Sequence, residues 1–205
     1  MTCARPASMF AAAAVATLFQ AGPIGAQPMT ETRISTAIIP VEHVVVRTKK
    51  PYIEVKAALE TRLGRLDSDI LRLLRENKVD ELRAALEKLA GRDGLAIHYV
   101  AAHGDWLILN GGRRNGIVYY IGNVLSAVAM TRQNFGAGLY APLRVAVYED
   151  ENGTTFEYDK PSTLCAQFHD PKIDEVSHRM IDWRPSWPLL HDRTKTIDKG
   201  HHYPT

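Results

Sequence analysis

The sequence has few cysteines, no long apolar run and no excess of charge of one sign. Its two cysteines, Cys3 and Cys165, are too few for the disulfide framework of a small secreted scaffold. No apolar stretch reaches the roughly 18 residues that a membrane span needs. The formal net charge is +2, and the Lys and Arg residues are scattered without interleaved aromatic residues, so we expect no nucleic-acid partner.

Common catalytic signatures are also missing. The chain holds no G-x-S-x-G, no phosphate-binding loop, no G-x-G-x-x-G and no C-x-x-C. The sequence therefore indicates no particular reaction, and we predict no cofactor. A length of 205 residues predicts one domain of ordinary size that can bury a core.

The N-terminus has the pattern of an export signal. Arg5 precedes an apolar run at residues 9–19, and small residues follow as far as Ala26. This order of charged, apolar and small residues predicts a signal peptide at residues 1–26, cleaved after Ala26, and a periplasmic or secreted protein. The alternative is an N-terminal extension that is not cleaved. Residues 27–40 show no lasting period and are interpreted as a linker.

A β-hairpin at residues 143–159 is the clearest structural prediction. Asn152-Gly153 tolerates the positive φ of tight turns, and apolar and polar residues alternate on both sides of it. One set of side chains is expected to face the core: Leu143, Val145, Val147, Phe156 and Tyr158. The other set is expected to share the opposite face: Arg144, Tyr148, Thr155, Glu157 and Asp159.

The rest of the chain predicts further strands and helices by the same periodicities. Strands are expected at residues 41–48, 95–100, 106–109 and 117–121. The first of these is expected to be central in the sheet, because Val45 on its second face is apolar too. Helices are expected after Pro51, in a leucine-packed insertion at residues 67–91, after the N-cap Asn123, and from residue 171. Three prolines preclude a regular element in a Trp/Pro-containing tail at residues 183–205.

The order of these elements describes one α+β domain at residues 41–182. Consecutive strands joined by short turns favour an antiparallel sheet, and the helices are expected mainly on one of its faces.

Several segments in fixed order resemble the domain of unknown function 302 family, in its exported bacterial branch. They are YIGN at 120–123, MTR at 130–132, GLYAPLRVAVYED at 138–150, FEYDKPS at 156–162 and the QF and DP pairs between 167 and 171. The resemblance implies a fold similar to the TATA-binding-protein-like arrangement, and it makes a homodimer a reasonable expectation. The family has no established activity, so no catalytic residues carry over. Val124 departs from the family's usual proline, and His169 from its frequent glycine.

Three functions are compatible with the side chains present. The first is a non-catalytic module that binds a small molecule or a partner through Arg144, Tyr148, Glu157 and Asp159. The second is a hydrolase that uses Arg144 with Glu157 or Asp159. The third is a periplasmic metal binder, which requires His98, His103 and His169 to converge.

The polar hairpin face also has a plainer interpretation as a solvated surface with an Arg144–Asp159 ion pair. Cys165 has two readings as well. It is interpreted as a small buried hydrophobe, with a nucleophile assisted by His169 four residues later as the alternative.

Overall fold

The computed structural model describes residues 32–181. The chain divides into two units, Met1–Ala37 and Ile38–Thr205, and every helix and strand of the described residues lies in the second. The signal peptide predicted at residues 1–26 and the tail at residues 183–205 lie outside the described residues. Between residues 32 and 181, none of the helices combines the length and apolar character that crossing a bilayer requires.

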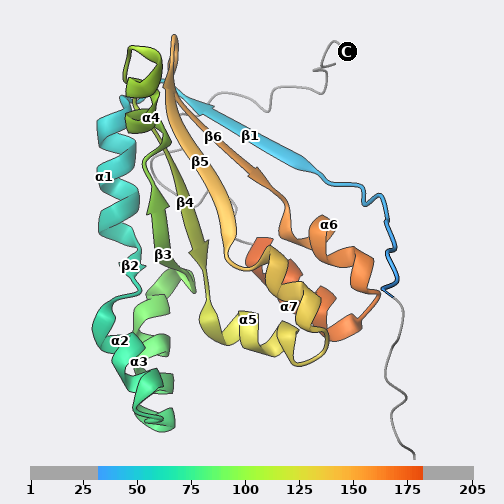
Figure 1. Ribbon diagram of the computed structural model, residues 1–205. Coiled ribbons are helices and arrows are strands. Elements are labelled where there is room, and N and C mark those ends of the chain that lie inside the picture. Colours follow the sequence, from blue (N-terminus) through green and yellow to red (C-terminus); the bar gives the residue numbers. More distant parts are fainter. Residues whose placement is uncertain (1–31, 182–205) are drawn as a thin grey trace, which may run out of the picture. The chain divides into compact units, whose positions relative to one another are not determined.

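Six strands form one sheet in the order β1-β6-β5-β4-β3-β2 (Figure 1). They are β1 His43–Thr48, β2 Gly64–Arg65, β3 Ala96–Ala101, β4 Gly116–Gly122, β5 Leu143–Asp150 and β6 Gly153–Asp159. All neighbouring strands are antiparallel except β2, which runs parallel to β3. The prediction of an α+β fold with a mainly antiparallel sheet is confirmed.

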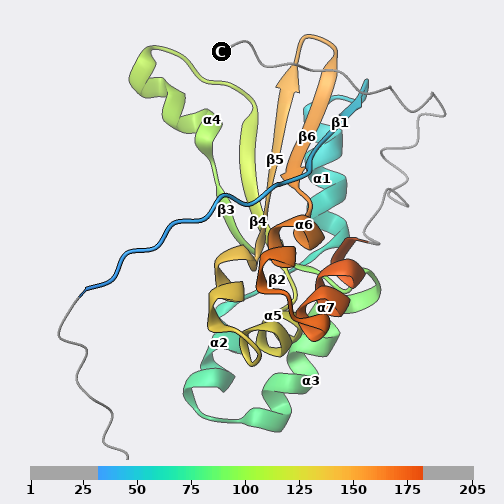
Figure 2. The same ribbon diagram turned by 90° about the vertical axis from the view of Figure 1, so that its right-hand side faces the viewer.

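Helix α1 (Tyr52–Arg62) covers one face of the sheet, which we call the core face (Figures 1 and 2). Val55 and Leu59 of α1 are completely buried. They pack with alternate residues of the central strands: Ile117, Tyr119, Ile121, Leu143, Val145, Val147 and Phe156. Tyr158 packs, partly buried, against the same cluster. The facing predicted for the hairpin is therefore confirmed.

A partly buried polar contact joins α1 to the sheet. The hydroxyl of Tyr119 donates to Oε1 of Glu60 at 3.0 Å, and Lys56 donates to the other carboxylate oxygen at 2.7 Å. Burial raises the pKa of Tyr119, and the negative charge of Glu60 raises it further. Burial opposes the charge of Glu60, but the hydrogen bonds from Lys56 and Tyr119 outweigh it, and the pKa of Glu60 is lowered.

The insertion predicted at residues 67–91 is a helical hairpin of α2 (Ser68–Arg75) and α3 (Val79–Ala90). The Asp67 side chain caps α2 by accepting from the backbone N–H of Ile70, and α3 ends at Gly91 with φ +52°. Of these two helices only Leu86 is fully buried. Past α3 comes η1 (Gly91–Asp93), where Asp93 accepts two hydrogen bonds from Arg62 at 2.6 and 2.7 Å.

A second, smaller core joins the helices at one end of the sheet. These are α5 (Val124–Thr131), η3 (Phe135–Tyr140), α6 (Pro161–Cys165), η4 (Ala166–Phe168) and α7 (Pro171–Ile181). Their shared core consists of Met130, Ala137, Cys165, Ile173 and Val176. Asn123 caps α5 through its side-chain oxygen, as expected. The helical period after Asn123 predicts Leu125, Val128 and Ala129 on the inner side. Val128 and Ala129 are instead exposed, and Met130 is buried in the core.

The prediction that the first strand is central is wrong, because β1 lies at an edge of the sheet. Its second-face residue Val45 is 36% exposed. Strict alternation in the strand expected at residues 95–100 predicts Leu95, Ile97 and Tyr99 on one face, and this prediction also fails in part. A register shift between Ile97 and Tyr99 sends Tyr99 to the opposite face from Ile97, because one extra residue reverses the facing of all that follow.

The apolar run at residues 106–109 is not the predicted strand. It belongs to α4 (His103–Trp106) and η2 (Leu107–Asn110). A short apolar run does not distinguish a strand from a helix by its period. Here the chain folds back, so that the Arg114 N–H donates to the Gly104 carbonyl at 3.2 Å. A Cβ at Gly104 would collide with the carbonyl oxygen of Arg114, so this reversal depends on a glycine.

Replacement of Gly153 by alanine is expected to destabilise the fold. Gly153 pairs with Asp150 across the two-residue turn and has φ +136°. A Cβ added at this position would clash with the carbonyl oxygen of Thr48. Gly153→Ala should lower the free energy of unfolding, measured in urea, by about 1–3 kcal/mol. Gly112→Ala is the control, because nothing lies within 4 Å of a Cβ there. Equal stability of the two variants would contradict the account.

Replacement of His169 by glycine is expected to stabilise the fold. His169 has φ +50° and ψ +36°, in the left-handed region, where a Cβ is crowded. His169→Gly should raise the free energy of unfolding by about 0.5–1 kcal/mol, after allowance for the freer unfolded chain. His169→Val should lower it, because a β-branched residue fits this region poorly. Thermal unfolding of the three proteins tests the order of stabilities.

Candidate functional site

The four predicted site residues share the face of the sheet opposite the core face, which we call the second face. Arg144 and Tyr148 come from β5, and Glu157 and Asp159 from β6. They alternate with buried Val145, Val147 and Phe156, so sealing the core face turns them outward. Arg144 is exposed, and the other three are partly buried.

His43 completes this group and is the residue that sequence reasoning did not assign to a site. It lies opposite Asp159 in the β1–β6 register. Its Nδ1 is 2.8 Å from Oδ1 of Asp159, and its Nε2 is 3.6 Å from Oε2 of Glu157. The imidazole therefore contacts Asp159 directly and lies farther from Glu157. The ion pair expected between Arg144 and Asp159 is not among those found in residues 32–181, where His43 contacts Asp159 instead.

Tyr148 extends the network along β5. Its hydroxyl donates a hydrogen bond to Oε1 of Glu157, and the guanidinium carbon of Arg114 lies 5.4 Å from the centre of its ring. Burial, together with the hydrogen bond to Glu157 and the charge of Glu157, raises the pKa of Tyr148 to about 12. The phenol therefore stays protonated as a donor throughout the physiological range.

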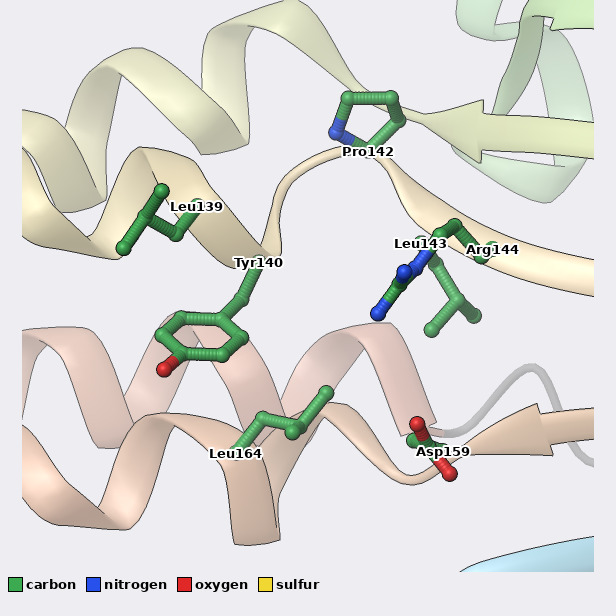
Figure 3. Close-up of a pocket in the computed structure, with 7 residues that line it drawn as sticks. All are labelled: Leu139, Tyr140, Pro142, Leu143, Arg144, Asp159 and Leu164. Carbon is green, nitrogen blue, oxygen red and sulfur yellow. The ribbon is translucent and has the colours of Figure 1, made fainter. Parts of the chain in front are cut away.

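Arg144 and Asp159 face a hollow at the end of the second face nearest α6 and η3 (Figure 3). Apolar side chains form its other walls: Leu139, Tyr140, Pro142, Leu143 and Leu164. The hollow has a volume of about 20 Å³, which is room for about one water molecule. Small-molecule pockets are typically about 300 Å³ or larger. The hollow therefore does not enclose a substrate.

The second face carries aromatic side chains farther from β1. The rings of Tyr99 and Tyr120 meet edge to face, with their centres 5.6 Å apart, and Tyr99 is 63% exposed. Val45 on β1 is also exposed. The described part of this face thus combines a polar network near β1 with an aromatic platform near β3, both open to solvent.

The described residues do not assemble the predicted metal centre. Between residues 32 and 181 no three His, Cys, Asp or Glu side chains are placed to hold one ion. His98 lies on β3, His103 begins α4, and His169 follows η4. His98 is notable because its buried Nε2 finds no hydrogen-bond partner in the described part of the chain. Burial lowers the pKa of His98, against a hydrogen bond with the backbone of Gly122.

Cys165 is a small buried residue of the second core, as its apolar neighbours predicted. It is 2% exposed, and burial raises the pKa of its thiol to about 11, with a smaller contribution from Asp174. A nucleophilic cysteine needs a lowered pKa and access. Its surroundings therefore favour packing over reactivity.

The titration of Tyr148 tests the network. In the folded protein its pKa is about 12 against a reference value of 10.0, so its contribution to stability is complete below pH 10 and is lost as the pH rises towards 12. Glu157→Gln removes the charge but not the burial, so the pKa of Tyr148 should fall only part of the way towards 10. Tyrosine ring NMR signals followed against pH, assigned with Tyr148→Phe, measure it. An unchanged pKa in Glu157→Gln would contradict the contact.

Comparisons with known proteins support the similarity suggested by the sequence. No curated protein matches the chain at a significant level. Among solved structures, it is similar to the crystal structure of uncharacterized conserved protein DUF302 from Bacillus stearothermophilus. The two share 15% sequence identity with a TM-score of 0.47, and the match covers 69% of this chain and 91% of that one. The family model described as "Domain of unknown function DUF302" matches residues 72–182, which is more than half of the sequence. The chain therefore belongs to the DUF302 family.

Proposed function

We propose that this protein is a non-catalytic binding module and that the second face of its sheet is the binding surface. The observation that carries the proposal is the partly exposed network of His43, Tyr148, Glu157 and Asp159, beside a hollow with room for only about one water molecule. Exposed polar groups next to aromatic side chains are common in recognition surfaces. The signal predicted at residues 1–26 would place the module in the periplasm or outside the cell.

The contacts of the two carboxylates favour binding over hydrolysis. A hydrolase built on Arg144 would need Glu157 or Asp159 directed at a shared substrate. Instead, His43 contacts Asp159, and the Tyr148 hydroxyl is bonded to Glu157. The hollow beside Arg144 also leaves room for about one water molecule. These features favour a binding surface with pre-ordered polar groups over an enclosed active site.

The shape and chemistry of the face suggest the kind of ligand. Glu157 and Asp159 accept hydrogen bonds, and charged carboxylates prefer cationic donors. Tyr99 and Tyr120 offer ring surfaces on the same side of the sheet. A flat group with cationic donors, from a small molecule or from the surface of a partner protein, satisfies both features.

Binding of small probes to the second face tests the proposal. Benzamidine and tyramine each combine a ring with a cationic donor. Backbone amide NMR shifts should respond on β1, β5 and β6, and the double variant Glu157→Gln/Asp159→Asn should weaken binding about tenfold, the loss of about 1.4 kcal/mol expected for a charged hydrogen bond. Glu81→Gln/Glu87→Gln, on the exposed side of α3, is the matched control and should bind like the wild type.

Two outcomes would contradict the binding module. One is the absence of probe binding at this face, or binding that the double variant leaves unchanged. The other is hydrolysis of an ester such as p-nitrophenyl acetate that is abolished by Arg144→Gln, which would establish the hydrolase instead.

A further inference from the structure

The helices of the second core leave an unusual set of large apolar side chains in solvent. Phe135 and Leu139 on η3 are 87% and 82% exposed. Ala137 between them is completely buried in the second core, so this short helix presents one side to the core and two large apolar groups to solvent. Exposed apolar groups that lie close together mark contact surfaces.

Aromatic side chains adjoin these two residues. Tyr140, at the end of η3, meets Phe168 edge to face with the ring centres 6.0 Å apart. The Phe168 ring in turn lies against Gly136, about 3.3 Å from where a Cβ would stand. Phe135, Leu139, Tyr140 and Phe168 together form what we call the η3 surface. Surfaces lined by aromatic rings are the usual docking sites of proline-containing segments.

The described chain ends close to this surface. Met180, in the last turn of α7, packs against the same second core that holds Ala137. Trp183 follows Ile181 by two residues and Trp187 by six, and an extended chain spans about 3.3–3.6 Å per residue. Both tryptophans are therefore within about 20 Å of the end of α7. Helix α4, which carries the exposed Trp106, lies at the other end of the sheet from α7 (Figures 1 and 2).

The sequence that follows α7 has the composition that such a surface binds. Residues 183–190 read WRPSWPLL, with prolines spaced as P-x-x-P and four large apolar side chains. Proline restricts the free chain, so less conformational entropy is lost on docking. We propose that residues 183–190 of this chain dock on the η3 surface of the same molecule. This contact is independent of the ligand proposed for the second face. Because Leu139 also lines the hollow beside Arg144, the docked segment would border that hollow.

Tryptophan fluorescence tests the contact in the full chain. The protein has three tryptophans, and Trp106→Phe leaves only Trp183 and Trp187 to emit. In this background the emission should be blue-shifted and protected from acrylamide, relative to the same protein in urea. Phe135→Ser/Leu139→Ser should abolish the protection. Both side chains are exposed, so circular dichroism should confirm that the variant stays folded.

A matched control separates docking from a general loss of apolar surface. Leu74 on α2 is 61% exposed, and Leu74→Ser should leave the protection unchanged. The proposal is overturned if acrylamide quenches the folded protein as strongly as the unfolded one, or if Phe135→Ser/Leu139→Ser changes nothing. Protection that appears only as the protein concentration rises would also overturn it, because the segment would then dock on a second copy.

Discussion

The register of the β5–β6 hairpin is the constraint on which the rest of the structure depends. Gly153 closes a two-residue turn with φ +136°, and from there the side chains alternate between two faces. Once Val145, Val147 and Phe156 are sealed under α1, the polar residues between them have only the second face to occupy. A slip of one residue would exchange the two sets and bury Arg144 and Glu157 at high cost.

The pairing of the edge strand β1 with β6 places His43 beside the carboxylates of the second face. His43 reaches Asp159 across 116 positions in the sequence, and it also approaches Glu157. Two neighbouring carboxylates repel each other unless a donor or a cation lies between them. His43 and Tyr148 supply such donors from opposite sides. Each carboxylate is thus held by one donor of the group and keeps further acceptor sites, and Arg144 remains exposed at its border.

The two cores have different consequences for function. The larger core packs α1 against the sheet, and a partly buried hydrogen bond between Tyr119 and Glu60 joins the two. The smaller core at the strand ends buries Cys165 and Ile173 completely or nearly so but leaves Phe135 and Leu139 outside. A few short helices cannot cover all of their own apolar surface. The helices at the end of the sheet near α7 therefore carry large apolar side chains that remain in contact with solvent.

The sequence by itself determined the features that depend on neighbours along the chain. Periods and local hydrogen bonds account for the hairpin turn at residues 150–153, the facing of Val145 and Arg144, the capping of α5 by Asn123 and the helices within residues 67–91. The family's frequent glycine at position 169 also matches the left-handed backbone found there. Such signals extend over a few residues and need no knowledge of the rest of the fold.

Only the tertiary structure decided which distant segments meet. The apolar face of Val45 suggested a central strand, but the pairing with β6 alone left β1 at the edge and placed His43 beside Asp159. The run at residues 106–109 had the composition of a strand, and only the return of the chain past Gly104 made it helical. Composition records how apolar a segment is, whereas its neighbours depend on packing and strand pairing across the whole domain.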